Sequence, residues 1–213
     1  MQSYKYSRDE QDSYCYPGTS VLRNKQGIRN AEALLLAERE IVSLKLLMLR
    51  VKPLRGRYGF SHLCKIHRFI FGDIYAWAGS IRRGEFMAKD TSIFCLGRHI
   101  PKNAERIFSA LAAENKLRSL KRRPFILRLA HYMSELNALH PFREGNGRAT
   151  REYFRQLSKS AGYELDFGGV TADKLLAADI AAFEGDNAPL VAILEGAVTA
   201  CRGGGQKGEH LKP

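Results

Sequence analysis

Apolar residues recur at helical spacing along most of this chain, starting near residue 30. Asn30 is a suitable N-cap for the first helix, and Pro53 would end that helix because proline cannot continue the backbone hydrogen bonding. One face carries apolar residues three or four positions apart, which we predict to point into the core: Leu34, Ala37, Ile41, Leu44 and Met48.

The same periodicity predicts further helices between about residues 61 and 201. Proline disfavours a helical conformation in the residue before it, and glycine is common just after a helix, so both residue types mark helix ends. The first starts near Ser61 and points Leu63, Ile66, Ile70 and Phe71 inward; the others cover 102–117, the stretch from Pro124 to the His140-Pro141 step, the stretch from Gly147 to Gly162, about 171–183, and 187–201.

Between Ile81 and Phe94 the helical period disappears. Short strand-like runs surround a polar turn there, which predicts a β-hairpin or flap. The predicted fold class is therefore all-α, a helical bundle with one small β-hairpin flap. The predicted flap comprises Gly84, Glu85, Phe86, Met87, Ala88, Lys89, Asp90 and Thr91.

A length of 213 residues fits one domain. Residues 30–201 form the predicted helical domain. Residues 1–29, which include the turn signal Tyr16-Pro17-Gly18, are predicted to be an irregular N-terminal segment that packs on this domain. Residues 202–213 are rich in Gly and Lys, and we predict that they form a flexible tail or the start of a linker.

The chain carries 34 basic and 22 acidic residues, and its net charge of +12 favours anionic partners. A DNA-binding protein is one alternative, but no helix-turn-helix or zinc motif supports it, so we do not expect nucleic acid as a partner. No apolar run reaches the roughly 18 residues of a membrane span, and the N-terminus lacks the apolar stretch of a signal peptide. We therefore expect a cytoplasmic protein with no membrane partner.

One stretch, residues 140–151, carries more polar chemistry than a helix connection needs. Gly145 and Gly147 can adopt positive φ, so the loop can curl and direct successive backbone N–H groups inward. The helix that follows adds its positive dipole end, and such helix starts bind phosphate. Arg148 and Arg151 lie three positions apart, so both project from the first turn and suit the oxygens of a polyphosphate.

Two more side chains extend this anion site. Glu144 would hold a cation there, since Mg²⁺ takes one or two carboxylates together with phosphate oxygens. His140 stands at the loop entrance, and the ordinary pKa of histidine suits a general base at neutral pH. The residues outline a nucleotide-transfer site. The alternative is a Gly-rich helix connector with surface arginines, and Phe142 is a core residue in either case.

The same stretch resembles a family signature. Residues 140–151 read HPFREGNGRATR and match every specified position of HxFx(D/E)GNGRxxR, the signature of Fic-domain proteins. The resemblance covers about residues 14–200 and implies a Fic-type helical bundle over 30–201. Stretches before the signature support the resemblance, because similar ones precede it in many bacterial members of the family: Tyr16-Pro17-Gly18-Thr19, Ile66-His67, Phe71-Gly72-Asp73 and Tyr75-Ala76-Trp77-Ala78-Gly79.

The resemblance implies an enzyme that transfers AMP from ATP to a Tyr, Thr or Ser hydroxyl of another protein. By that resemblance, His140 would deprotonate the hydroxyl and Phe142 would anchor the loop in the core. Glu144 would bind a Mg²⁺ ion that bridges the nucleotide phosphates.

The remaining signature residues would bind the phosphates. Gly145, Asn146 and Gly147 would form the anion hole, and Arg148 and Arg151 would contact the β- and γ-phosphates of ATP. The flap would bind the target segment by strand-like pairing and so fix its position.

The resemblance also implies partners. The protein substrate would be of the topoisomerase-subunit or the small-GTPase class, and the enzyme would be a bacterial toxin or an effector translocated into another cell. Many members are silenced by a helix with the pattern (S/T)xxxE(G/N), whose Glu pairs with the second signature arginine, here Arg151. Ser160 and Glu164 have this spacing, but Leu165 follows them. We therefore expect a separate small antitoxin that carries the motif.

Two alternatives stay open within this resemblance. A Fic enzyme can transfer another phosphate-linked group, such as UMP, phosphocholine or phosphate. A nucleotide-binding regulatory module would hold the nucleotide without transfer, but the intact His140, Glu144 and Arg151 favour the enzyme.

Overall fold

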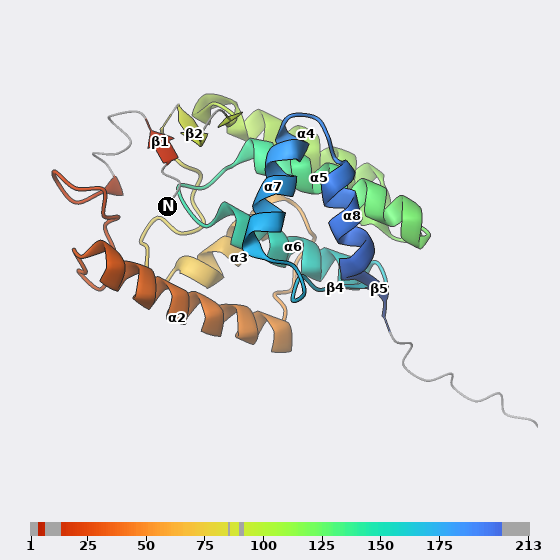
Figure 1. The fold of residues 1–213 in the computed structure, drawn as a ribbon, viewed down its shortest axis with the longest axis horizontal. Coiled ribbons are helices and arrows are strands. Elements are labelled where there is room, and N and C mark those ends of the chain that lie inside the picture. The colour runs from red at the N-terminus through yellow and green to blue at the C-terminus, as the bar shows by residue number, and fades with distance from the viewer. Residues whose placement is uncertain (1–3, 7–13, 85, 90–91, 202–213) are drawn as a thin grey trace, which may run out of the picture.

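A computed structural model of the protein describes residues 4–6, 14–84, 86–89 and 92–201, which form a helical bundle with two small sheets (Figure 1). The α-helices are α2 (Ala31–Val51), α3 (Phe60–Phe71), α4 (Ile100–Ala113), α5 (Arg122–Leu139), α6 (Asn146–Ser160), α7 (Ala172–Phe183) and α8 (Ala188–Ala197). Short 3₁₀ turns cover Gly97–His99 and Asn115–Leu117. The all-α prediction is confirmed.

Helix α5 is the centre of the bundle. It packs against α4, α6, α7 and α8, and its inward residues Phe125, Ile126, Leu129 and Ala130 are fully buried. On the other side of α6 lies α3, and α2 covers α3 from outside (Figure 1). No helix in the described ranges combines the length and the apolar composition that a bilayer crossing requires.

The predicted hairpin exists, and a third strand joins it. Strands β2 (Met87–Lys89) and β3 (Ser92–Ile93) pair antiparallel, with Ala88 opposite Ile93. Strand β1 (Tyr4–Tyr6) pairs antiparallel with the other edge of β2, so the order is β1-β2-β3. The N-terminal segment was predicted to be irregular, and β1 corrects that prediction. A three-residue strand has no periodicity of its own, so only its pairing partner identifies it.

Two predicted helices end earlier than expected. Helix α4 stops at Ala113 instead of residue 117, because Asn115, Lys116 and Leu117 all have positive φ between 51° and 62°. Helix α8 stops at Ala197 instead of residue 201. The next residues form β5 (Val198–Ala200), which pairs with β4 (Tyr163–Leu165) after α6 and closes the C-terminal end of the bundle.

The buried face of α2 differs from the predicted one. Leu34 is buried as expected, but the other buried residues are Glu38, Val42 and Leu49. The predicted core residues Leu44 and Met48 are 59% and 45% exposed. The apolar pattern led to the wrong face because the helix turns a carboxylate inward, where other polar groups of the fold pair with it.

Two leucines of α2 test this assignment with the same chemical change. Leu49 is fully buried, so Leu49→Ala is expected to lower the free energy of unfolding by about 2–5 kcal/mol. Leu47 is 58% exposed, so Leu47→Ala is expected to change it by less than about 0.5 kcal/mol. Urea unfolding of both variants measures the difference, and equal losses would contradict the assigned face.

Candidate active site

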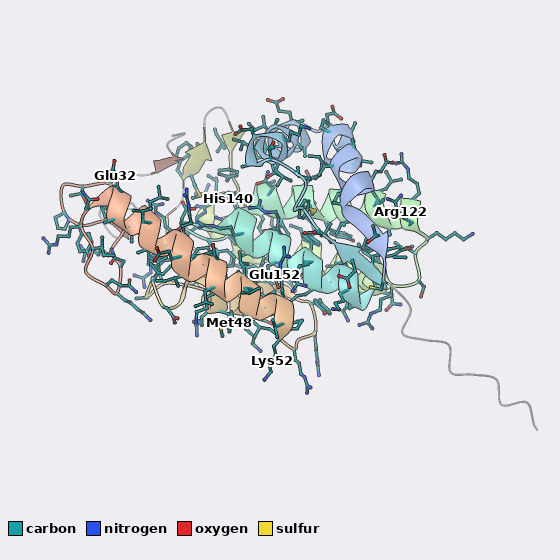
Figure 2. All side chains as sticks on the ribbon, turned by 60° about the horizontal axis from the view of Figure 1, so that its bottom comes forward. Glu32, Met48, Lys52, Arg122, His140 and Glu152 are labelled. Carbon is teal, nitrogen blue, oxygen red and sulfur yellow. The ribbon has the colours of Figure 1, made fainter. Side chains whose placement is uncertain are left out.

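The loop that carries the polar residues runs from His140 to Gly145 and joins α5 to α6. His140 ends α5 with left-handed backbone angles, φ 43° and ψ 61°. Pro141 after it disfavours a further helical turn. Gly145, directly before α6, is also left-handed, with φ 80°. These two residues turn the chain at each end of the loop, and Figure 2 shows His140 beside the start of α6.

Asn146 closes the loop with its side-chain amide. Its Oδ1 accepts a hydrogen bond from the backbone N–H of Phe142 at 2.8 Å, and its Nδ2 donates to the carbonyl of Phe142 at 2.8 Å. The Asn146 side chain is buried, so it satisfies both backbone groups where water cannot. Its amide therefore holds the loop, and only its backbone N–H faces the anion site as part of the first helical turn.

Phe142 anchors the loop in the core, and His67 on α3 completes the anchor. The two rings stack with centroids 3.9 Å apart, and neither residue is exposed. Nδ1 of His67 accepts the N–H of Gly79 at 2.9 Å, so Nε2 carries the proton and donates to the carbonyl of Glu144 at 2.8 Å. Burial lowers the pKa of His67 to about 4, which keeps this tautomer neutral at physiological pH.

The imidazole of His140 is held in one orientation. Its Nδ1 donates to the carbonyl of Asn137 at 3.2 Å, which assigns the lone pair to Nε2. The Phe94 ring stacks on the imidazole with centroids 3.8 Å apart. The ring, 4% exposed, is thus fixed in orientation and tautomer, and its Nε2 can accept a proton.

Arg82 connects this loop to the flap. Its Nε donates to the His140 carbonyl at 3.0 Å, and its backbone N–H donates to the Pro141 carbonyl at 2.9 Å. The same guanidinium donates to the carbonyls of Gly84 and Cys95, which lie on the two sides of the hairpin. One buried side chain therefore couples the position of the flap to that of the loop.

The start of α6 has the properties of an anion site. The first N–H groups of a helix have no partner within it, and the helix dipole makes this end positive. Gly145 permits the turn sterically: a Cβ there would lie 2.3 Å from the Phe71 ring. Gly147 makes room on the other side, since a Cβ there would lie 3.0 Å from Nη1 of Arg151.

The two arginines of α6 have different surroundings. Arg148 donates to Glu38 at 2.7 Å, and its other terminal nitrogen lies 3.4 Å from Oε1 of Glu144. Arg151 lines a small pocket between α5, α6 and α7, together with Asp179. Burial lowers the pKa of the Arg151 guanidinium and the Asp179 carboxylate opposes that shift, so the group stays charged.

Glu144 is the residue that could hold a metal ion. Its side chain is 29% exposed, and its Oε1 accepts the Gly145 N–H at 2.9 Å as well as the Arg148 contact. Within the described ranges no group of three His, Cys, Asp or Glu residues could bind a metal on its own. A single accessible carboxylate beside a phosphate site nevertheless fits Mg²⁺, which takes its other ligands from phosphates and water.

The flap residues divide into several groups. Met87 and Ala88 are buried, Phe86 is 37% exposed, and Gly84 is half-buried. Lys89 ends β2, while the predicted flap residues Glu85, Asp90 and Thr91 lie outside the described residues.

Beside the flap lies a groove of about 300 Å³. One wall is Phe94, the residue that stacks on His140, and β3 forms the outer edge of its sheet along the same side. The groove is lined by Ile93, Phe94, Cys95, Asn103, Arg106, Ile107, Glu135, Ala138, Leu139 and Phe183.

The structure thus brings His140, Glu144, Arg148 and the start of α6 together around one loop. Sequence reasoning did not assign roles to Arg82, which contacts this loop, or to Glu38, which contacts Arg148 in the first turn of α6; both come from distant parts of the chain. No sequence signal marked them, because each has charged neighbours along the chain, Arg39 and Glu40 beside Glu38 and Arg83 beside Arg82.

Comparison with known proteins identifies the family. Residues 58–157 match the Fic/DOC family. The probable protein adenylyltransferase Fic of Salmonella typhimurium is 38% identical over 191 residues, which cover 90% of this chain and 94% of that protein. The protein adenylyltransferase VbhT of Bartonella schoenbuchensis is 37% identical over 91% of this chain, which spans 40% of VbhT. This chain belongs to the Fic/DOC family.

Solved structures agree with that assignment. The BepC effector protein of Bartonella tribocorum, solved with bound AMPPNP, superimposes with a TM-score of 0.87 and 28% identity, covering 92% of this chain and all of that one. The Fic domain of a Bep effector from Bartonella quintana, solved with bound ADP, gives a TM-score of 0.85 and 27% identity, covering 88% and 95%. The predicted Fic-type bundle is confirmed.

Two glycines with positive φ test the packing of the loop. Gly162→Ala is expected to lower the free energy of unfolding by about 1–2 kcal/mol, the cost of a left-handed backbone with a Cβ, because no atom would lie within 4 Å of that Cβ. Gly145→Ala adds a clash with Phe71, so we expect it to cost at least about 1 kcal/mol more in unfolding free energy. Urea unfolding of the two variants measures both values. If they lose the same amount, Phe71 does not restrict the loop.

Proposed function

We propose that this chain transfers AMP from ATP to a hydroxyl of a Tyr, Thr or Ser side chain in a target protein. The observation that carries the proposal is the start of α6, where unpaired N–H groups and Arg148 lie beside the loop that holds His140. The relatives named protein adenylyltransferase and the nucleotides bound in the Bartonella structures support the same activity and ATP as its co-substrate.

His140 is the general base of this reaction. Its Nε2 takes the proton of the target hydroxyl, whose oxygen forms a bond to the α-phosphorus of ATP. The bond from that phosphorus to the bridging oxygen of the β-phosphate breaks, and pyrophosphate leaves with the electron pair. The contact from Nδ1 to the Asn137 carbonyl holds the imidazole in the tautomer that accepts this proton.

The phosphates bind at the start of α6. The backbone N–H groups of Asn146 and Gly147 face them, while that of Gly145 donates to Glu144 at their edge. The guanidiniums of Arg148 and Arg151 bind the β- and γ-phosphates. Most of the rate enhancement comes from this positioning and from charge neutralisation, as in other phosphoryl-type transfers. Glu144 would hold Mg²⁺, which would neutralise part of the phosphate charge.

The target segment binds along the flap. Strand β3 lies at the edge of its sheet and can accept a further strand, in the β-augmentation mode of peptide recognition. The apolar groove at its side leads to Phe94 and therefore to His140. A target of the topoisomerase-subunit class or the small-GTPase class would present its hydroxyl residue here.

Inhibition comes from a separate antitoxin with the (S/T)xxxE(G/N) helix. The one stretch of this chain with similar spacing, Ser160 to Glu164, lies at the end of α6 opposite the loop, about 20 Å along the helix. Glu164 belongs to β4, which pairs with β5, and its carboxylate lies 3.9 Å from Nζ of Lys159 at that end of α6. The protein therefore acts as a bacterial toxin, or as an effector translocated into another cell.

Labelled ATP tests the transfer directly. We expect the purified protein with Mg²⁺ and α-labelled ATP to add a labelled protein band to bacterial or eukaryotic lysate. With γ-labelled ATP the protein should add no band to those of the lysate's own kinases, because pyrophosphate carries that label away. His140→Ala is expected to reduce labelling at least 100-fold. His99→Ala, which changes an exposed histidine at the start of α4, is the matched control and should retain full labelling.

Three outcomes would contradict the proposal. Labelling by γ-labelled ATP would indicate phosphate transfer. ATP binding without labelling in either lysate would indicate a regulatory module. Equal labelling by the His140→Ala variant would show that His140 is not the general base.

A further inference from the structure

Glu38 belongs to α2, yet it reaches the nucleotide site more than 100 residues further along the chain. Its side chain is 10% exposed, and each carboxylate oxygen has a partner. Oε1 accepts from Nη1 of Arg148 at 2.7 Å, and Oε2 accepts from the hydroxyl of Tyr75. A carboxylate with so little exposure is stable only when it is paired in this way.

The Tyr75 hydroxyl fixes the carboxylate. Tyr75 is 1% exposed, and burial together with the adjacent Glu38 raises its pKa far above the ordinary value of tyrosine. The hydroxyl therefore stays protonated and donates at every physiological pH. Glu38 cannot turn away from Arg148 without leaving a buried donor unsatisfied.

Arg148 is consequently restrained on three sides. One terminal nitrogen donates to Glu38, the other faces Glu144 at 3.4 Å, and the guanidinium carbon lies 4.7 Å from the centre of the Phe71 ring. A free arginine side chain loses rotamer entropy when it orders around a ligand. Here that loss is already incurred during folding.

We propose that Glu38 is a positioning residue for ATP, which acts through Arg148 by holding its guanidinium in the orientation that binds the phosphates. This inference rests on the proposed function, since it takes the start of α6 as the phosphate site. It adds α2 and Tyr75 to the machinery that the family signature alone would confine to residues 140–151.

The charge of Glu38 would affect ATP binding in the opposite direction to its positioning role. Glu38 neutralises part of the positive charge of Arg148, so if charge alone mattered, removal of the carboxylate would strengthen ATP binding. Positioning predicts weaker binding instead. The conservative variant Glu38→Gln separates the charge effect from the positioning effect, because glutamine keeps a hydrogen-bond acceptor and the shape of the side chain but removes the charge.

The experiment measures the Kd of ATP and of AMP by titration of the intact chain. We expect Glu38→Ala to weaken ATP binding about tenfold, the scale of one charge-assisted hydrogen bond, and Glu38→Gln about threefold. AMP lacks the β- and γ-phosphates, so its Kd should change less than about twofold. Glu40→Gln, an exposed neighbour on the same helix, is the matched control and should leave both Kd values unchanged.

A double-mutant cycle shows whether Glu38 acts through Arg148. In an Arg148→Ala background, Glu38→Gln should have no further effect on the Kd of ATP. Tighter ATP binding in Glu38→Ala, equal weakening of ATP and AMP, or full additivity with Arg148→Ala would each overturn the proposal. These measurements concern binding only, so they are independent of the transfer assay. If the unmodified protein shows the expected binding pattern but transfers no AMP, the proposed function is contradicted and the role of Glu38 in ATP binding is not.

Discussion

The pair of hydrogen bonds between the Asn146 amide and the backbone of Phe142 is the constraint on which the rest of the site depends. They close a five-residue turn in the interior, where neither backbone group could reach water. Because Asn146 is also the first residue of α6, the same side chain fixes the loop to the end of the helix that faces it. The loop that begins with His140 and the start of α6 are thereby held together.

Further buried polar contacts extend this rigidity outward. His67 holds the carbonyl of Glu144 from α3, Arg82 holds the carbonyl of His140 from the flap, and Glu38 holds Arg148 from α2. Each is a buried polar group whose removal would leave its partner unsatisfied, at a cost of about 1–3 kcal/mol. Three separate segments of the chain therefore support one loop, and an ATP molecule would meet groups that need little rearrangement.

The sequence was most informative where the chemistry is contiguous. The twelve signature residues follow one another along the chain, so turn formation at glycine and helix polarity sufficed to predict an anion site at Gly145 to Arg151. Helix positions followed from apolar periodicity: α3 begins close to the predicted residue, and α5 and α6 begin and end close to the predicted residues.

The sequence was least informative where contacts join distant residues. Glu38 went unnoticed because apolar periodicity treats a charged residue as solvent-facing, and the predicted face of α2 was wrong for the same reason. Strands β1 and β5 exist only through pairing with β2 and β4, and strands of three residues leave no periodic trace. The roles of Arg82 and His67 depend on backbone carbonyls, whose positions no sequence pattern reveals.

The most direct test of a preformed site is a crystal structure of the protein with Mg²⁺ and a non-hydrolysable ATP analogue, compared with a crystal structure of the free protein. The account predicts that the phosphates lie against the N–H groups at the start of α6. Arg148 should still contact Glu38, and the backbone of residues 140–147 should be the same in both structures. A nucleotide bound elsewhere, or a loop that refolds around it, would contradict the account.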